Sequence, residues 1–323
     1  MKKTICILLS ISMLLLSACT SKYFKDADAA AQRFNASAEK ANEAIEEFNT
    51  GLENICSANA AFREEIEGCR KLLEEERLAA DEEALIAFFD SIERASASLK
   101  SDPSYEKVPP VPLLSPDKSM GDEELQEIIA KASEKITVSL KILPELPDYS
   151  NETAELKEAK EAYEKARNEL SVPSAPTEDF VIERISALPT VQKASNVTEG
   201  NDPNNLLGTE NGYTACIYFT DSRVNKNKIT DLGKVDRSDP LMLGAQGGGA
   251  VEVYDSVDKA IARMKVLQAY APEVTESGIY HSGLRRVGGF KLVGTILIRS
   301  SSLLDSNKQQ QLIEDIQAAL CEL

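Results

Sequence analysis

The chain of 323 residues contains no tryptophan and only one histidine, His281. These absences argue against a large aromatic platform for carbohydrate and against a metal site built from several histidines. Extended clusters of lysine and arginine are also missing from a chain whose formal net charge is -17. Phosphate binding needs such clusters, so we expect no nucleic-acid partner. We also expect no cofactor and no metal ion, and we assign no catalytic residue.

The sequence also lacks an apolar run of the roughly 20 residues that a transmembrane helix needs. The run over residues 5–16 is shorter, and it lies between two lysines and the segment Leu16-Ser17-Ala18-Cys19. This order of basic, apolar and small residues is typical of a secretory signal peptide. Its ending resembles the lipobox of bacterial lipoproteins. The resemblance implies cleavage between Ala18 and Cys19 and attachment of lipid to the Cys19 thiol.

Lipid on Cys19 predicts a protein anchored to the extracytoplasmic face of the cell membrane. Without residues 1–18, which carry two lysines, the net charge falls from -17 to -19. An acidic surface of this kind gives no polybasic contact with anionic lipid. Attachment therefore depends on the acyl chains, and more than one is needed because a single chain anchors only marginally. The alternatives are a plain signal peptide cut near Ala18 and an uncleaved anchor.

The six cysteines of the sequence include Cys6 in the signal peptide and Cys19 in the lipobox. The other four, Cys56, Cys69, Cys216 and Cys321, allow three disulfide connectivities. On one continuous helix, at about 1.5 Å per residue, the Cα atoms of Cys56 and Cys69 would lie about 20 Å apart. A disulfide requires less than about 7 Å. Cys56 and Cys69 could then not bridge each other. Of the other pairings we favour Cys216 with Cys321, and buried free thiols are an equal alternative.

A heptad pattern extends from Phe24 to Leu73 without a change of phase. Small and apolar residues recur at alternating steps of three and four: Phe24, Ala27, Ala31, Phe34, Ala38, Ala41, Ile45, Phe48, Leu52, Ile55, Asn59, Phe62, Ile66, Cys69 and Leu73. This period predicts a helix of roughly 75 Å with a coiled-coil seam. Shorter helices folded back on the seam, or self-association of two copies through it, would bury these side chains. Asn59 in the seam either fixes its register or lies partly exposed.

The remainder of the helical half divides into shorter elements. The phase breaks near residues 74–81, where either a reversal with Asp81 as N-cap or a stutter in a longer helix would explain the change. Five prolines within residues 102–116 predict an extended linker that no helix can cross. Apolar periodicity predicts two more helices, over residues 121–143 and 156–170. We expect a helical stalk or bundle over residues 19–172.

A second linker at residues 173–176 precedes a change to strand-like patterns. We expect strands near residues 191–197, 213–219, 251–254 and 292–299, and helices near 180–188, 256–267 and 305–320. This order predicts a small α+β sandwich over residues 177–323, with helices covering one face of a largely antiparallel sheet. The fold class of the whole chain is therefore α+β, with a long-helix region followed by the sandwich.

Three motifs of this second half resemble a known domain. They are the segment Asn201-Asp202-Pro203-Asn204 with Gly212 to Phe219 after it, the segment Gly247 to Tyr254, and the segment Gly294 to Arg299. Together they are similar to an uncharacterised domain of surface lipoproteins from Gram-positive bacteria. The resemblance covers roughly the last 145 residues, leaves the helical half unmatched and implies no catalytic residue.

Four features of this half have both a chemical and a structural interpretation. Gly247-Gly248-Gly249 could cradle an anion, but it leads into a strand, which favours a bend or a close backbone contact. Oxygen ligands around Asp202 do not match an EF-hand loop, so an Asx turn explains them better than calcium. A histidine beside a serine, at His281, is typical of an exposed loop. If the domain binds an anionic ligand, we expect the contacts at Arg285 and Arg286.

The sequence favours a non-enzymatic envelope lipoprotein whose lipid-anchored helical stalk presents an α+β module for binding a protein, the wall or a small molecule. The anchor, the heptads and the lack of a set of nucleophile, base and orienting residue support this interpretation. A ligand-capturing lipoprotein of a transport system is the first alternative and would need two α/β lobes. An envelope hydrolase is the second, and would need clustered polar residues in a pocket.

Overall fold

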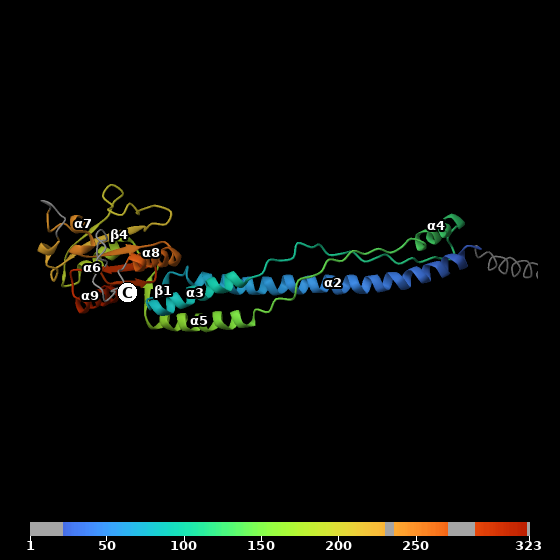
Figure 1. The fold of residues 1–323 in the computed structure, drawn as a ribbon, viewed down its shortest axis with the longest axis horizontal. Coiled ribbons are helices and arrows are strands. Elements are labelled where there is room, and N and C mark those ends of the chain that lie inside the picture. Colours follow the sequence, from blue (N-terminus) through green and yellow to red (C-terminus); the bar gives the residue numbers. More distant parts are fainter. Residues whose placement is uncertain (1–21, 230–235, 271–287, 322–323) are drawn as a thin grey trace, which may run out of the picture. The chain divides into compact units, whose positions relative to one another are not determined.

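The computed structural model of the protein describes residues 22–229, 236–270 and 288–321. The chain divides into two compact units (Figure 1). Unit 1 comprises residues 1–61 and 100–148, and unit 2 comprises residues 62–99 and 149–323. This division differs from the boundary that we expected at residues 173–176. Residues 62–99 and 149–172, predicted as part of the stalk, belong to the same unit as the sheet because they share a core with it.

Helix α2, Phe24–Leu72, confirms the long helix predicted from the heptads and contributes to both units. Eleven of the predicted seam positions are buried: Ala27, Ala31, Ala38, Ile45, Phe48, Leu52, Ile55, Asn59, Phe62, Ile66 and Cys69. These side chains are buried within a single chain. The chain itself covers the seam, so a second copy is not needed to bury it, in contrast to the self-association that we considered.

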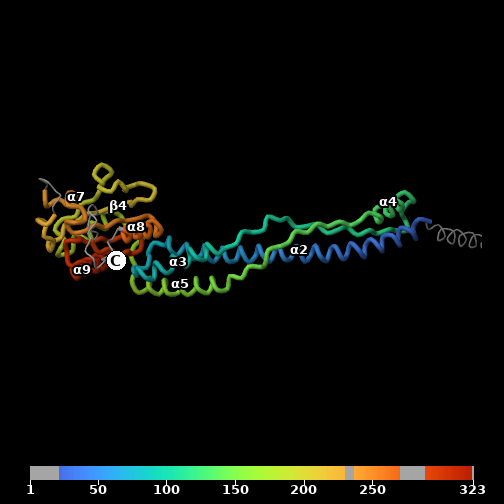
Figure 2. The backbone as a smooth tube through the Cα atoms, in the orientation of Figure 1, coloured from blue at the N-terminus to red at the C-terminus, as the bar shows by residue number. Residues whose placement is uncertain are grey.

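Unit 1 consists of the first part of α2, two extended segments and the short helix α4, Asp122–Ala132. The extended segments run beside α2, and α4 joins them (Figure 2). The first contains the prolines of residues 102–116 and confirms the predicted lack of helix there. The second packs on the helix at Gly51, where a Cβ atom would lie 2.7 Å from Leu143 Cδ1.

The helix predicted over residues 121–143 is only partly correct, because α4 ends at Ala132. Beyond it the chain is extended as far as α5, Ser150–Glu169. The apolar residues of this stretch repeat at helical spacing, but Ile136, Thr137 and Val138 are β-branched and Pro144 follows. These residues favour an extended backbone over a helix.

Two helices of unit 2, α3 (Glu82–Ser98) and α5, pack beside the last turns of α2. Helix α3 begins at Asp81, whose side chain accepts a hydrogen bond from Ala84 N at 2.8 Å. The predicted N-cap is therefore correct, and the chain reverses here. Phe88 of α3 stacks on Tyr163 of α5 with ring centroids 4.7 Å apart. Strand β1, Arg77–Ala79, precedes α3 and pairs antiparallel with β2, Ser171–Pro173.

A five-stranded sheet forms the remainder of unit 2, in the order β3-β4-β5-β7-β6 with every neighbouring pair antiparallel. Its strands are β3 (Val191–Asn196), β4 (Ala215–Asp221), β5 (Gly248–Val253), β6 (Phe290–Val293) and β7 (Ile296–Ser300). The predicted α+β class is correct. The short elements η1 (Lys226–Lys228), α7 (Pro240–Leu243) and η2 (Gly244–Gly247) lie between β4 and β5 in the sequence.

Helices cover both faces of this sheet, whereas we expected them on one. Helix α8, Val257–Tyr270, contributes Ile261 and Met264 to the core on one face. Helices α6, Glu178–Ser186, and α9, Ser306–Cys321, form the core of the opposite face. Strands β4, β5 and β7 carry apolar residues at consecutive positions, so both of their faces are buried. The strands of a sheet that is buried on both faces have nearly continuous apolar sequences.

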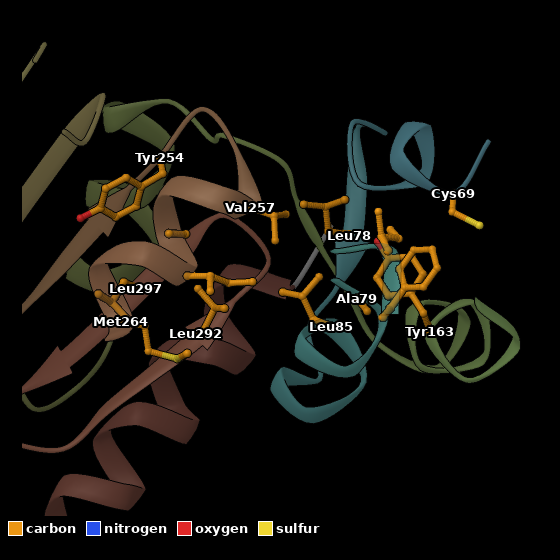
Figure 3. Close-up of a cluster of buried hydrophobic side chains, with 14 of the residues drawn as sticks. Cys69, Leu78, Ala79, Leu85, Tyr163, Tyr254, Val257, Met264, Leu292 and Leu297 are labelled. Carbon is orange, nitrogen blue, oxygen red and sulfur yellow. The ribbon is translucent and has the colours of Figure 1, made fainter. Parts of the chain in front are cut away.

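The core on the α8 face continues to helices α3 and α5. Leu78 and Leu85 lie next to Val257 and Leu292, and Tyr163 lies on the side of α3 and α5 (Figure 3). Gly294, in the turn between β6 and β7, approaches β2 so closely that a Cβ atom would lie 2.7 Å from Val172 Cγ1. The shared core explains why these helices and the sheet form one compact unit.

The four cysteines in the described part of the chain are free thiols. The disulfide that we expected between Cys216 and Cys321 is therefore not formed, and the alternative of free thiols holds. Cys216 lies on the α8 face of β4, whereas Cys321 ends α9 on the opposite face. The sheet separates the two sulfur atoms. Cys56 and Cys69 both lie on α2, as the argument against their pairing assumed.

Candidate functional site

Most residues that the sequence assigned to a site lie outside the described residues. These are Ala18 and Cys19 at the lipobox, and Arg285 and Arg286 near the single histidine. The three motifs that carry the C-terminal resemblance lie within the described residues. They come together on the α8 face of the sheet as one group of polar residues with two hydrogen-bonded halves, one around Glu252 and one around Asp202.

We call this group the polar cluster. It comprises Asp202, Asn204, Tyr213, Tyr218, Glu252, Tyr254, Arg263 and Arg299. The register of β4, β5 and β7 brings Glu252 and Arg299 together. Glu252 is opposite Cys216 and Leu297, and Arg299, two residues after Leu297, is opposite Ala250 on the same face of the sheet. Apart from Arg263 on α8, every member belongs to one of the motifs that carry the resemblance.

Glu252 is the centre of the first half of the polar cluster and is fully buried. Its carboxylate accepts hydrogen bonds from Arg299 Nη1 at 2.7 Å, Arg263 Nε at 3.1 Å and Tyr254 Oη at 2.8 Å. Burial alone would raise the pKa of this carboxyl. The two guanidinium groups outweigh that effect and hold the pKa of Glu252 below its usual range.

Asp202 is the centre of the second half. One carboxylate oxygen accepts from Tyr213 Oη at 2.5 Å and from Asn204 N at 2.8 Å, and the other accepts from Leu206 N and Leu207 N at 2.6 and 2.8 Å. Burial would raise the pKa of Asp202, but these donors outweigh it and lower the pKa. The bond to Asn204 N closes the Asx turn, which confirms that interpretation. A carboxylate engaged by four donors is a poor calcium ligand.

The tyrosine hydroxyl groups of the polar cluster, and the thiol of Cys216 near it, are held in their neutral forms. Burial raises the pKa of Tyr213, Tyr218 and Tyr254. Burial, reinforced by the Glu252 carboxylate, also raises the pKa of the Cys216 thiol well above its usual value. Nucleophilic cysteine chemistry requires the thiolate. Cys216 is therefore a packing residue and not a nucleophile.

The polar cluster is saturated by its own members. Glu252 is neutralised by two arginines, and Asn204 Nδ2 donates to Tyr218 Oη at 3.0 Å, which ties the Asp202 half to β4. In the described residues, Thr220 Oγ1 is the only buried side-chain nitrogen or oxygen atom without a hydrogen-bond partner. No group of three metal-ligating side chains occurs in those residues either. Chemically, the arrangement ties α8 and the loop around Asp202 to the sheet.

Gly248 and Gly249, at the start of β5, lie in close backbone contacts, and Gly247 before them packs on the Leu243 side chain. A Cβ atom on Gly248 would lie 2.6 Å from Asp221 N, and one on Gly249 would lie 2.1 Å from Arg299 O. No side chain fits at either position. The structural interpretation of this segment is therefore correct, and its glycines serve the approach of β4 and β7 to β5.

Unit 1 contains a regular feature that we did not predict, which we call the asparagine ladder. Asn35, Asn42 and Asn49 of α2 each form two hydrogen bonds with the backbone of one residue in the extended segment. Their Nδ2 atoms donate to the carbonyl oxygens of Leu114, Val111 and Val108 at 2.8, 3.0 and 2.9 Å. Their Oδ1 atoms accept from the N–H groups of the same three residues at 2.8, 2.6 and 2.9 Å.

The asparagine ladder works because two periods match. Seven residues of α-helix rise about 10.5 Å, and three residues of extended proline-rich chain advance about 9–10 Å. Asparagines seven residues apart therefore meet every third residue of a segment that runs in the opposite direction. Beyond the ladder, Asn59 Nδ2 donates to Asp102 Oδ1 at 2.8 Å. Asn59 is fully buried and contacts its own chain, which replaces both roles that we considered for it.

A groove follows α9 on the opposite side of the sheet from the polar cluster. One hollow of about 440 Å³ is lined by Glu82, Gly289, Phe290, Lys291, Ser306, Gln309, Gln310, Ile313 and Glu314. A second of about 400 Å³ is lined by Leu170, Glu314, Gln317, Ala318 and Cys321. Glu314 lines both, so the two hollows are neighbours along the helix. We call them together the α9 groove.

Comparisons with models of protein families, with curated proteins and with solved structures found no match for this chain. None of the helices in the described part of the chain has the combination of length and hydropathy that a membrane span requires.

Proposed function

We propose that this protein is a non-enzymatic lipoprotein of the bacterial cell envelope, anchored through lipid on Cys19 at the extracytoplasmic face of the membrane. In this proposal unit 1 is a braced spacer that follows the anchor along the chain, and unit 2 is a module that binds a partner. We further propose that the sheet domain is related to the surface-lipoprotein domain that its motifs resemble.

The asparagine ladder is the observation that carries the proposal. Helix α2 begins at Phe24, five residues after Cys19. A single exposed helix of this length gains little stability from propensity alone, because helices in water depend on packing. Six hydrogen bonds from three asparagines hold an extended segment against the first part of α2. Such bracing is expected of a spacer that must stay straight beside a membrane.

The chemistry of unit 2 favours binding over catalysis. The charged groups of the polar cluster engage one another, and burial keeps the Cys216 thiol protonated. The α9 groove is open and lined by amide and carboxylate side chains. Groups of this kind recognise a partner through hydrogen bonds and charge.

Fractionation of cells that express the wild type and Cys19→Ser tests the anchor. We expect the wild type in the membrane fraction, and the variant unprocessed or released into the medium. Cys56→Ser is the matched control, because it removes a thiol from α2 and should leave the protein in the membrane. Membrane retention of Cys19→Ser, with unchanged incorporation of radiolabelled palmitate, would contradict the proposal.

A further inference from the structure

The α9 groove has the elements of a peptide-binding groove, namely the edge of a sheet beside a helix. Among the residues that the structure describes, strand β6 pairs with β7 alone and is an edge strand of the sheet. Helix α9, with 16 residues, lies beside it and extends about 24 Å at about 1.5 Å per residue. An extended peptide of about seven residues, at about 3.3 Å per residue, has the same length.

The register of β6 shows which of its backbone groups face outward. Ser300 N donates to Gly289 O at 2.8 Å, so the carbonyl group of Gly289, just before β6, points towards β7, while its N–H donates to Gln309 Oε1. Positions alternate along an antiparallel pair, so the N–H and C=O groups of Phe290 and Leu292 point away from β7. Leu292 confirms this direction, because its N–H donates to Glu82 Oε2 at 2.7 Å.

The Glu82 carboxylate thus occupies the place that the carbonyl oxygen of a neighbouring strand would take at Leu292. At Phe290, which lines the groove, the outward backbone groups face the hollow beside α9. An added strand can exchange two main-chain hydrogen bonds there, as in other cases of strand addition to a sheet edge. On the helical side of the hollow, Gln309 is engaged by Gly289 N and Leu304 O, whereas Gln310 donates to Glu314 at 2.9 Å and keeps its amide oxygen for a partner.

The side chains of the α9 groove favour a cationic partner with an apolar residue. Glu82 and Glu314 contribute two carboxylates, and Lys291 contributes one ammonium group. The chain as a whole has a formal net charge of -17, which attracts cationic segments over a longer range. At the other end of the groove Leu170 is 45% exposed beside Ala318, so an apolar side chain of the partner can be buried there.

We propose that the α9 groove binds an extended, cationic peptide segment of a partner protein, whose main chain pairs with β6 at Phe290. This inference rests on the proposed function, in which unit 2 is the binding module, and it names the chemistry of the partner. It does not depend on the lipid anchor, so the two proposals fail in different experiments.

Selection from a phage-displayed library of random nonapeptides, with the full chain carrying Cys19→Ser as target, tests this proposal. We expect enriched peptides with lysine or arginine and alternating apolar residues. Glu314→Lys and Gln310→Lys should each weaken the binding of a selected peptide about tenfold or more, because both add positive charge to the groove. Glu158→Lys on exposed α5 is the matched control and should change the affinity less than about twofold.

A scan of the selected peptide by N-methylation tests the strand pairing. Methylation of the amide that donates to Phe290 should weaken binding by about tenfold or more, because one main-chain hydrogen bond and its geometry are lost. Failure to enrich any peptide, enrichment of acidic peptides, or equal affinity for Glu314→Lys and the wild type would overturn the proposal. Insensitivity to methylation at every position would overturn the pairing with β6.

Discussion

Substitution of the central rung of the asparagine ladder is the most informative perturbation of unit 1. In Asn42→Ala the side chain loses its bonds to both backbone groups of Val111, at 3.0 Å from Nδ2 and 2.6 Å from Oδ1. Each partly buried hydrogen bond contributes about 1 kcal/mol net, which gives about 2 kcal/mol. Alanine is the better helix former by about 0.6 kcal/mol, but this gain acts on α2 whether the extended segment is closed or open and does not offset the loss.

We therefore expect Asn42→Ala to lower the free energy of local opening of the extended segment by about 2 kcal/mol, which is about a thirtyfold change in an equilibrium constant. Hydrogen–deuterium exchange measures this opening directly. Amides of residues 108–114 should exchange about thirtyfold faster in the variant. Amides of the sheet in unit 2 should be unchanged.

The matched control is Asn54→Ala, on the same helix at an exposed position outside the ladder. It should leave exchange at residues 108–114 unchanged and add up to about 0.7 kcal/mol of helix propensity. If Asn42→Ala and Asn54→Ala give the same exchange rates in this segment, the ladder does not hold the extended chain to α2 and the reasoning is refuted.

Three further predictions concern unit 2. Arg299→Ala leaves the buried Glu252 carboxylate with one guanidinium group, so urea unfolding should show a loss of about 3–5 kcal/mol, whereas Arg94→Ala, at an exposed pair, should cost less than about 1 kcal/mol. The pKa of Asp202 is lowered in the folded state, so its stabilisation is present above the unfolded value near 4 and is lost as the pH falls further. Urea unfolding between pH 6 and pH 3 should therefore show a shallower decline for Asp202→Asn, and an unchanged slope would contradict the role of this carboxylate. Gly68→Ala should raise the free energy of unfolding by about 0.5–1 kcal/mol, because no atom lies within 4 Å of the added Cβ atom; a loss of stability would show that the site is packed.

Sequence patterns predicted the elements whose signal is local. The heptad phase predicted α2, and Asp81 predicted the start of α3, because periodicity and capping depend on neighbours in the chain. The alternating and continuous apolar runs predicted β4, β5 and β7 for the same reason. Their covering by helices on both faces was missed, although a strand such as Ala215–Asp221 without polar positions facing solvent is the signal for it.

Features that depend on distant residues could not be predicted in this way. The spacing of Asn35, Asn42 and Asn49 is visible in the sequence, but its partners lie 59 to 79 residues away. Glu252 in a strand gives no sign of which arginines neutralise it, because Arg263 and Arg299 reach it from different elements. The motifs that carry the resemblance did contain most of the polar cluster. Buried residues that form hydrogen bonds and ion pairs with one another can be replaced by few other residue types.

Mass spectrometry of the N-terminal tryptic peptide of the protein purified from membranes tests the anchor most directly. We expect a peptide of residues 19–22, ending at Lys22, with a diacylglyceryl group on the Cys19 thiol. A chain that begins at another residue, or an unmodified Cys19 at the N-terminus, would contradict this prediction.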